Sequence, residues 1–325
     1  MSLRIHANDG ISAQAQRSLE NEGFTVTTNN VAQEALAGHI NNEKVDVLLV
    51  RSATKVRKEL MDQCPRLRMI GRGGVGLDNI DVAHAREKGI EVINTPGASS
   101  GSVAELVMAH LFTLIRDLHK SNRRMPTEGA ATFKALKKEY EKGTELRGKT
   151  LGIIGFGRIG RCTAAYALGC GMKVIYLDRS ATTESIALQI GGVNVRVPVR
   201  LVDMDTLLAQ SDAITLHVPA QADGSAMIGA AEFARMKNGV VLVNTARGGT
   251  VDEDALIEAI KSGKVRGAAL DVFVNEPTPR ADILAMDQIS LSPHIGGATV
   301  EAQDRIGDEL VDQIISWHST ADVGR

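Results

Sequence analysis

The chain has 325 residues, of which 43% are hydrophobic and 23% charged, and its formal net charge is −2. This is the composition of a globular protein with room for about two domains, and so small a charge gives no general attraction to nucleic acid or acidic membranes. Cys64, Cys162 and Cys170 include no C-x-x-C pair, so we expect buried thiols rather than disulfides or a metal site. The amino terminus lacks a signal-peptide pattern, and the longest apolar run is broken by Glu105 and His110, which predicts a cytoplasmic protein.

Short β-rich apolar runs alternate with helical patterns along most of the chain. In the first series the expected strands are 3–7, 24–28, 45–50, 67–70 and 90–93, and the helices between them end at Leu19 or span 31–40, 56–64 and 81–89. In the second series the expected strands are 151–154, 173–178, 213–218, 240–246, 265–273 and 289–293. This rhythm predicts an α/β fold with two doubly wound parallel sheets.

The segments outside the two series suggest how the domains are connected. A long amphipathic helix is expected from Ser102 to about Lys120, followed by a polar loop to residue 149. A last helix, from about Val300 to His318, has no sheet of its own and should return to the first series. The predicted domains are therefore a discontinuous, flavodoxin-like domain and a Rossmann-type domain, at 1–100 with 295–325 and at 101–294.

The pattern G-x-G-x-x-G occurs twice, and its context separates the two copies. GFGRIG (155–160) follows a strand and opens a helix rich in small residues, and the next strand ends in Asp178, 18 residues after Gly160. A carboxylate there can accept hydrogen bonds from a ribose, while Arg158 and the helix N-terminus favour a pyrophosphate. We predict a dinucleotide site that favours NAD, although Arg179 leaves NADP open.

GRGGVG (71–76) does not pass the same test. The strand that follows it ends in Asn94 rather than an acid, and Asp78 and Asp81, the latter an expected N-cap, would repel a pyrophosphate. The loop remains a run of exposed backbone N–H groups beside Arg72, and such a run suits a smaller anion such as a carboxylate.

Nine motifs along the chain carry a family resemblance. They are VRSATKV (50–56), GRGGVGLDNID (71–81), NTPGASSGSVAEL (94–106), TELRGKTLGIIGFGRIG (144–160), TLHVP (215–219), NTARGGTVDE (244–253), GAALDVFVNEP (267–277), SPHIGGAT (292–299) and EAQDRIG (301–307). Through them the chain resembles the D-isomer-specific 2-hydroxyacid dehydrogenases, and among these the phosphoglycerate dehydrogenases. The resemblance implies that the second domain binds NAD, that the first supplies much of the substrate site, and that the active site lies in the cleft between them. It also implies a homodimer, or a dimer of dimers, formed through an arm at about 102–145.

The resemblance also assigns catalytic and cofactor residues. His294 would be the general acid/base, Glu276 would bond its far ring nitrogen, and Arg247 would hold the substrate carboxylate. Arg247 and Glu276 follow expected strands and His294 ends one, at the edge where α/β sheets bind ligands. The residues implied to contact the cofactor are Gly155, Gly157, Arg158, Ile159, Gly160, Asp178, His217, Pro219, Thr245, Asp271 and Gly296.

The substrate is expected to be a phosphorylated 2-hydroxy acid. Arg51 and Arg72 match the family's phosphate-binding arginines, and Val75, Gly76 and Asn79 would contact the same ligand. The implied reaction is the oxidation of D-3-phosphoglycerate to 3-phosphohydroxypyruvate in serine biosynthesis, and its reverse. About thirty residues follow the SPHIGG motif, too few for a serine-binding regulatory domain. Two alternatives stay open: a reductase of an unphosphorylated 2-oxo acid such as hydroxypyruvate or glyoxylate, and an NAD-sensing scaffold that turns over no substrate.

Overall fold

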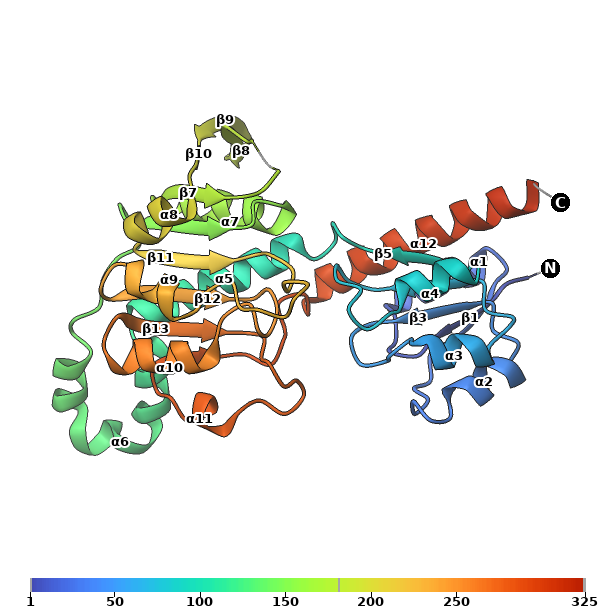
Figure 1. The fold of residues 1–325 in the computed structure, drawn as a ribbon, viewed down its shortest axis with the longest axis horizontal. Helices are drawn as coiled ribbons and strands as arrows, with labels where there is room; N and C mark the ends of the chain where they lie inside the picture. Colours follow the sequence, from blue (N-terminus) through green and yellow to red (C-terminus); the bar gives the residue numbers. More distant parts are fainter. Residues whose placement is uncertain (1, 181, 324–325) are drawn as a thin grey trace. The chain divides into compact units, whose positions relative to one another are not determined.

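The structure is a computed structural model that describes residues 2–180 and 182–323. The chain divides into two compact units, the first formed by Met1–Ser99 and Gly297–Arg325 and the second by Ser100–Gly296. The chain therefore passes between the units twice, at residues 99–100 and again at 296–297. Each unit is built around a parallel sheet of its own (Figure 1).

The first unit contains a five-stranded parallel sheet in the order β2-β1-β3-β4-β5, which is the doubly wound order of flavodoxin-like folds. Its strands are β1 (Arg4–Ala7), β2 (Thr25–Thr27), β3 (Val47–Val50), β4 (Met69–Arg72) and β5 (Glu91–Asn94). Its helices are α1 (Ala13–Asn21), α2 (Leu36–Asn42), α3 (Lys58–Gln63), α4 (Val82–Glu87) and α12 (Val300–Val323).

Burial explains the strand sequences of this sheet. All four residues of β3, the central strand, are buried, because helices cover both faces of a parallel sheet and leave no polar side to alternate with. Ile314 of α12 packs into the same apolar cluster as Leu19 of α1, so the last helix completes this core. Asp81 caps α4 by accepting a hydrogen bond from the His84 backbone N–H, which confirms the predicted N-cap.

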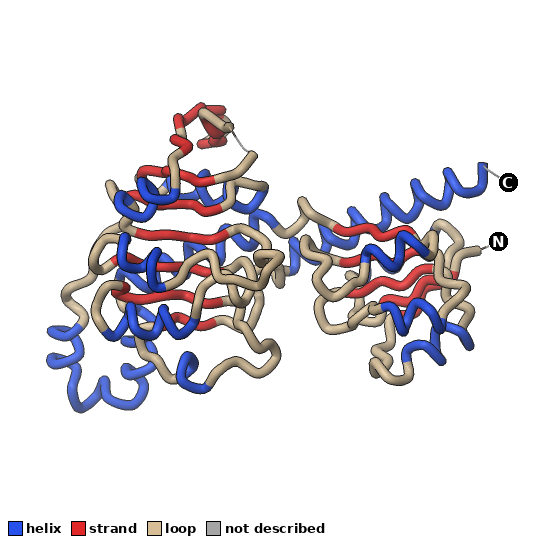
Figure 2. The backbone as a smooth tube through the Cα atoms, viewed as in Figure 1, coloured by secondary structure: helices blue, strands red, loops and turns tan. Residues whose placement is uncertain are grey.

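The second unit contains a seven-stranded parallel sheet in the order β10-β7-β6-β11-β12-β13-β14, and Figure 2 shows these strands side by side. Its strands are β6 (Thr150–Ile154), β7 (Lys173–Leu177), β10 (Arg200–Leu201), β11 (Ala213–Leu216), β12 (Val240–Asn244), β13 (Val265–Leu270) and β14 (Ile289–Leu291). Its helices are α5 (Ser100–Ile115), α6 (Leu118–Glu139), α7 (Arg158–Gly169), α8 (Met204–Gln210), α9 (Ala230–Arg235), α10 (Glu253–Lys261) and α11 (Ala281–Leu284).

The strand order of this second sheet reverses direction at one place. From β6 the chain builds outward to β7 and β10, and then returns to add β11 to β14 on the other side of β6. This is the Rossmann order with one further strand, and ligands bind such sheets at the carboxyl ends of the strands near the reversal. The predicted fold class of two doubly wound parallel sheets is therefore confirmed.

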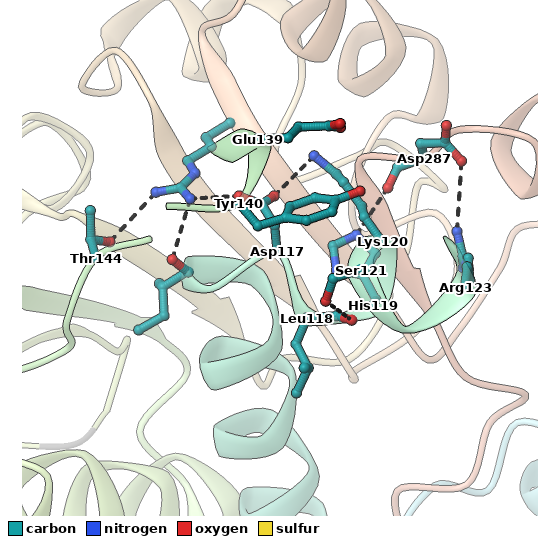
Figure 3. A network of polar contacts seen from close by, with 12 residues as sticks. Asp117, Leu118, His119, Lys120, Ser121, Arg123, Glu139, Tyr140, Thr144 and Asp287 are labelled. Atoms are coloured by element: carbon teal, nitrogen blue, oxygen red, sulfur yellow. Dashed lines mark hydrogen bonds and ion pairs between the residues drawn. The ribbon is translucent and has the colours of Figure 1, made fainter. Parts of the chain in front are cut away.

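The segment that links the two sheets in the sequence differs from the prediction. The expected helix at 102–120 ends instead at Ile115, and the expected polar loop is largely helix α6, which bends at Thr132. Asp117 separates the two helices with a left-handed φ of 50°, a conformation that Asp tolerates better than most residues. Its carboxylate is held by Lys120 and by Arg266, each at 2.9 Å, in the polar network of Figure 3. Burial alone would raise the pKa of Asp117, but the hydrogen bonds from the two cations hold it below its usual value.

Two smaller features were also not predicted. A two-stranded antiparallel hairpin, β8 (Ser185–Ile190) and β9 (Val193–Pro198), turns through Gly191 and Gly192, and both glycines have positive φ. A Gly-Gly pair between β-branched runs is a hairpin signal that the sequence did contain. The three cysteines are free thiols, but Cys162 and Cys170 are only half-buried, whereas full burial was expected.

Candidate active site

The residues predicted to bind cofactor and to carry catalysis follow successive strands of the second sheet. In spatial order, the strand ends carry Asp178 after β7, Gly155 to Gly160 after β6, His217 and Pro219 after β11, Thr245 and Arg247 after β12, Asp271 and Glu276 after β13, and His294 and Gly296 after β14. Parallel strands present all their carboxyl ends at one edge, so these loops are neighbours. β14 ends at Leu291, so His294 stands three residues beyond the strand rather than at its end.

The loop after β6 has the geometry of a pyrophosphate cradle. A Cβ on Gly155 would lie 2.5 Å from the His217 carbonyl oxygen, and one on Gly160 would collide with the Gly155 carbonyl, so both positions must be glycine for packing reasons. A Cβ on Gly157, by contrast, would meet no atom within 4 Å. Gly157 is the N-cap of α7, so open space lies where a ligand would approach the helix N-terminus. These residues fit a dinucleotide.

Asp178 is tied to this glycine loop. Its Oδ2 accepts a hydrogen bond from the Phe156 backbone N–H at 2.6 Å, and its Oδ1 accepts one from the Ser180 N–H at 2.9 Å. The carboxylate is half-buried, whereas Arg179 is exposed. Asp178 therefore helps to shape the loop, and a carboxylate in this place disfavours a 2′-phosphate.

Two buried polar atoms at the carboxyl edge of the second sheet have no protein partner. They are Nδ1 of His217 and the hydroxyl oxygen of Thr245, on the loops after β11 and β12. The opposite ring nitrogen of His217 lies 3.2 Å from the hydroxyl of Thr215, and burial lowers the pKa of His217 to about 3, so its imidazole is neutral. Unsatisfied buried polar groups are rare in proteins. These two are donors or acceptors that a bound cofactor can use.

His294 and Glu276 form a hydrogen-bonded pair in the structure. His294 Nδ1 lies 2.7 Å from Glu276 Oε2, while the other oxygen of Glu276 accepts the Phe273 backbone N–H at 2.9 Å. Because a carboxylate only accepts hydrogen bonds, Nδ1 carries the proton and Nε2 is left for a reacting group. Both side chains are partly exposed. His294 has a left-handed φ of 54°, which is unusual for a residue with a Cβ.

Arg247 lies on a loop that packs against the Glu276 loop. Its carbonyl oxygen accepts hydrogen bonds from the side chains of Asn244 and Thr250, at 3.0 and 2.7 Å. A Cβ on the next residue, Gly248, would collide with the Phe273 carbonyl oxygen, so the backbones of the two loops touch. All three predicted catalytic residues are thus placed by adjoining loops of one unit.

A pocket of about 370 Å³ lies beside the His294–Glu276 pair. Most of its remaining wall is apolar and comes from Phe273, Pro277, Pro279, Leu284, Leu291 and Pro293. An apolar wall therefore borders one side of the partly exposed pair.

Asp271 and Gly296, both predicted to contact the cofactor, hold the loop that carries His294. Asp271 is 1% exposed, and its carboxylate accepts the backbone N–H groups of Ile295 and Gly296, each at 2.9 Å. It also accepts the hydroxyl of Ser292 at 2.6 Å. Through these three hydrogen bonds the carboxylate fixes the loop from Ser292 to Gly296. The sequence motif did not indicate this function.

In the first unit, the 71–76 loop offers fewer free amides than the sequence suggested. The Gly73 N–H donates to the Val50 carbonyl at 2.9 Å, and the Gly74 N–H donates to the Thr95 hydroxyl at 2.8 Å. Asn94, at the end of β5, donates to the Val75 carbonyl at 2.6 Å. The first half of the loop is therefore used internally. Only its second half, the exposed Val75 and the half-buried Gly76, is left to meet a ligand, and it is the half named in the prediction.

The two predicted phosphate-binding arginines both lie along this loop. Val50 pairs with Arg72 in the register of β3 and β4, so Arg51 follows β3 directly beside Gly73. A Cβ on Gly73 would lie 3.6 Å from Arg51 Cγ, and one on Gly74 would lie 2.5 Å from the Arg72 guanidinium. The two cationic side chains thus lie beside consecutive glycines of the same turn.

Asn79 is used mainly within the protein. Its side-chain N–H groups donate to the carbonyls of Arg51 and Thr54, at 2.8 and 2.7 Å. Asp9, which sequence reasoning missed, accepts the Arg51 N–H at 2.6 Å and the Thr54 hydroxyl at 2.6 Å. An acid just after the first strand was the available signal. Asp9 and Asn79 together fix the turn from which Arg51 projects.

Within residues 2–180 and 182–323, no three His, Cys, Asp or Glu side chains are grouped so as to hold a metal ion. Over the same residues, no helix combines the length and the apolar character needed to cross a bilayer.

Comparisons with known proteins identify the family of this chain. Residues 108–296 match the family model of the D-isomer specific 2-hydroxyacid dehydrogenase NAD binding domain. The chain is 45% identical over 315 residues to a hydroxypyruvate reductase of Thermotoga maritima, covering 96% of this chain and 97% of that one. It is 40% identical to a D-3-phosphoglycerate dehydrogenase of Archaeoglobus fulgidus, covering 97% of this chain but only 57% of the relative.

A solved structure gives the same result. The NAD complex of a formate dehydrogenase from Staphylococcus aureus superposes with a TM-score of 0.79 at 28% identity, covering 97% of this chain and 96% of that one. The family model covers more than half of the chain, and it falls on the sheet whose glycine loop has the pyrophosphate geometry. This chain therefore belongs to the D-isomer-specific 2-hydroxyacid dehydrogenase family, and its cofactor is NAD.

Proposed function

We propose that this protein catalyses the reversible, NAD-dependent oxidation of D-3-phosphoglycerate to 3-phosphohydroxypyruvate. The observation that carries the choice of a phosphorylated substrate is the placement of Arg51 and Arg72 beside consecutive glycines of one loop. A guanidinium binds phosphate oxygens through two parallel hydrogen bonds, so two of them on one turn match a dianionic group. Hydroxypyruvate and glyoxylate have no second anionic group to place there.

In this proposal His294 moves the proton of the substrate hydroxyl. The cofactor, held by the 155–160 loop, would supply the acceptor for the hydride of the substrate carbon, and the hydroxyl proton would pass to His294 Nε2 as the carbonyl forms. Glu276, at 2.7 Å from Nδ1, keeps that nitrogen protonated, which leaves the lone pair of Nε2 as the base. In the reverse direction the doubly protonated ring donates from Nε2 to the carbonyl oxygen, and the Glu276 carboxylate stabilises its charge.

Arg247 is proposed to bind the substrate carboxylate. Its loop touches the loop of Glu276 at Gly248 and Phe273, which fixes its backbone relative to the acid/base pair. A planar guanidinium can bind a carboxylate with two hydrogen bonds and so orient the carbon next to it. The amides of Val75 and Gly76 are proposed as further donors to the substrate.

A second candidate is the reduction of hydroxypyruvate. One specific observation favours it, because a relative that is 45% identical and is matched over nearly its whole length is a hydroxypyruvate reductase. The acid/base chemistry would be the same, and only the use of Arg51 and Arg72 would differ.

A homodimer formed through α5 and α6 is also part of the proposal. These helices expose the large apolar side chains of Phe112, Leu118, Met125 and Phe133, between 42% and 57% of each. Contiguous exposed apolar patches mark protein interfaces, and we propose that these four side chains contribute to one. Sedimentation of the protein as a monomer at micromolar concentration would contradict the dimer.

The deciding experiment follows NADH consumption with 3-phosphohydroxypyruvate, hydroxypyruvate, glyoxylate and 2-oxoglutarate. We expect the phosphate ester to be the most efficient substrate. Loss of a hydrogen-bonded charged contact costs about 1.5–3 kcal/mol, so Arg72→Ala should raise its KM by roughly 10- to 100-fold. The ratio of kcat/KM for the phosphate ester to that for hydroxypyruvate should fall by the same factor.

Arg86→Ala is the matched control, because it removes the same charge from an exposed position on α4 of the same unit. It should leave the ratio unchanged. Equal efficiency of the wild-type protein on hydroxypyruvate and its phosphate ester would reject the phosphate site and select the second candidate. Absence of turnover with all four 2-oxo acids would reject both.

A further inference from the structure

The backbone at His294 is strained and is held from several sides. Its φ of 54° lies in the left-handed region, which residues with a Cβ occupy only where the surroundings require it. The residues on its carboxyl side are fixed by Asp271, which accepts the N–H groups of Ile295 and Gly296. On its amino side, Ser292 donates its hydroxyl to the same carboxylate at 2.6 Å. The conformation of His294 therefore depends on where Asp271 and Ser292 are held.

A chain of buried hydrogen bonds extends from this loop to helix α5. His110 Nε2 lies 3.0 Å from the Ser292 hydroxyl, and His110 Nδ1 lies 3.0 Å from the Ser290 hydroxyl. His110, Ser290, Ser292 and Asp271 are each less than 9% exposed. Helix α5 packs against β12, β13 and β14, which brings His110 next to the last strand before the His294 loop.

The donor and the acceptor of each hydrogen bond in this series can be assigned. Asp271 only accepts, so Ser292 must donate to it, and the Ser292 oxygen is then left to accept from His110 Nε2. The opposite nitrogen, Nδ1, consequently accepts from Ser290. Burial lowers the pKa of His110, which keeps the ring neutral with the one donor and one acceptor that this order needs. An apolar side chain could fill the same space without the cost of removing polar groups from water. Packing alone therefore does not explain this series of buried polar residues.

The same helix also binds the other end of the loop. Ser102, in the first turns of α5, donates its hydroxyl to the Gly296 carbonyl at 2.7 Å. Gly296 is the last residue of the second unit, and α5 begins with the first residue of that unit, Ser100. Helix α5 therefore forms hydrogen bonds with the His294 loop on both sides of His294, at Ser292 and at Gly296.

We propose that His110 is a positioning residue, which acts through Ser292 and Asp271 to hold His294 in its strained, reactive orientation. This inference rests on the proposed acid/base function of His294. His110 is buried, and its two ring nitrogens are bonded to Ser290 and Ser292. It supplies the hydrogen bond that orients the Ser292 hydroxyl toward Asp271, and it connects the loop to helix α5, which packs on the sheet.

The test replaces His110 with leucine and with glutamine and measures steady-state NADH oxidation with 3-phosphohydroxypyruvate and with hydroxypyruvate. A misplacement of a catalytic group by about 1 Å can cost about 100-fold in rate, so His110→Leu should lower kcat by roughly 10- to 100-fold. The Kd for NADH should change by less than about twofold. The amide of His110→Gln can donate to Ser292 and accept from Ser290, so it should recover most of kcat.

Leu114→Ala provides the matched control for general weakening of α5. Leu114 is buried in the same helix but has no polar group, so this variant should lower the melting temperature while kcat stays at the wild-type value. Ser292→Ala interrupts the chain with a smaller change. If His110→Leu does not fold, a 10-fold or larger loss of kcat in Ser292→Ala, with NADH binding intact, supports the proposal instead.

The outcomes separate this inference from the proposed function. Wild-type kcat in His110→Leu, or in Ser292→Ala where the leucine variant does not fold, would overturn the positioning function. Loss of kcat in His110→Gln equal to that in His110→Leu would also overturn it. His294→Ala is assayed in parallel, and full activity in that variant would instead reject the proposed function of His294.

Discussion

At the scale of single residues, the carboxylate of Glu276 divides its two oxygens between two tasks. Oε1 accepts the Phe273 N–H and so fixes the carboxylate in its own loop, and Oε2 bonds His294 Nδ1 at 2.7 Å. A side chain anchored in this way can select one tautomer of the imidazole. Because each oxygen has its own partner, replacing one carboxylate oxygen of Glu276 with an amide NH₂ group should be enough to disturb the hydrogen bond to His294.

Glu276→Gln is the corresponding prediction. The amide can donate toward His294 Nδ1, which would place the proton on Nε2 and block it as a base. Wrong-tautomer substitutions of this kind lower kcat by as much as about 10⁴-fold in a serine protease, and here we expect a fall of at least about 100-fold. NADH affinity, measured by fluorescence titration, should stay within a factor of two or so of the wild-type value. A kcat near that of the wild type would show that Glu276 does not control the tautomer.

The sequence allowed some of these residues to be found and not others. Arg247, Glu276 and His294 stand in motifs, so their resemblance to a family identified them. His110 and Asp9 stand in no motif, and their partners Ser292 and Thr54 are 182 and 45 residues away in the chain. Only packing shows that such residues support a site.

At the scale of elements, the loop after β6 separates two reasons for a glycine. Gly160 is needed because a Cβ would collide with the Gly155 carbonyl, whereas a Cβ on Gly157 would meet open space. The first is a packing requirement between strand and helix. The second concerns the approach of a ligand to the helix N-terminus.

Alanine at these two positions should therefore have different effects. Gly160→Ala overpacks the turn and should lower the free energy of unfolding by about 1–3 kcal/mol, visible as a lower melting temperature. Gly157 has a φ of −71°, which alanine adopts freely. The melting temperature of Gly157→Ala should therefore match that of the wild type, while its NADH affinity falls. Equal melting temperatures, or unchanged NADH binding by Gly157→Ala, would contradict this distinction.

The break between α5 and α6 shows where element prediction fails. The stretch after Ile115 is mostly polar and contains Pro126, so it resembled a loop, yet its Lys, Glu and Ala residues are good helix formers. The end of α5 depends on Asp117, whose left-handed conformation is held by Arg266, 149 residues further along the chain. A local pattern carries no information about that ion pair.

At the scale of the whole molecule, buried neutral histidines couple stability to pH. Burial lowers the pKa of His217 from its ordinary value of 6.5 to about 3. Between these two values the unfolded chain binds a proton that the folded chain refuses. The contribution of neutral His217 to the free energy of unfolding is therefore fully present above pH 6.5. It declines as the pH falls toward 3, by up to about 1.4 kcal/mol per pH unit.

His217→Asn should remove this part of the acid sensitivity. Urea unfolding of the wild type and the variant at pH 6.5 and pH 4.5 gives two losses of free energy on acidification. We expect the loss in the wild type to exceed that in the variant by about 2–3 kcal/mol, because one buried group no longer has to be protonated on unfolding. Equal losses would show that His217 does not contribute to acid unfolding.

The sequence by itself determined the alternation of strands and helices, the two parallel sheets, the nucleotide loop and the family. These follow from local periodicity, from glycine spacing and from motifs that are contiguous in the chain. The tertiary structure alone decided which amides of the 71–76 loop stay free, how Asp271 is used, and where α5 ends. Each of these depends on a hydrogen bond or an ion pair to a residue at least about twenty positions away, and such a partner is fixed only when the sheets and helices pack.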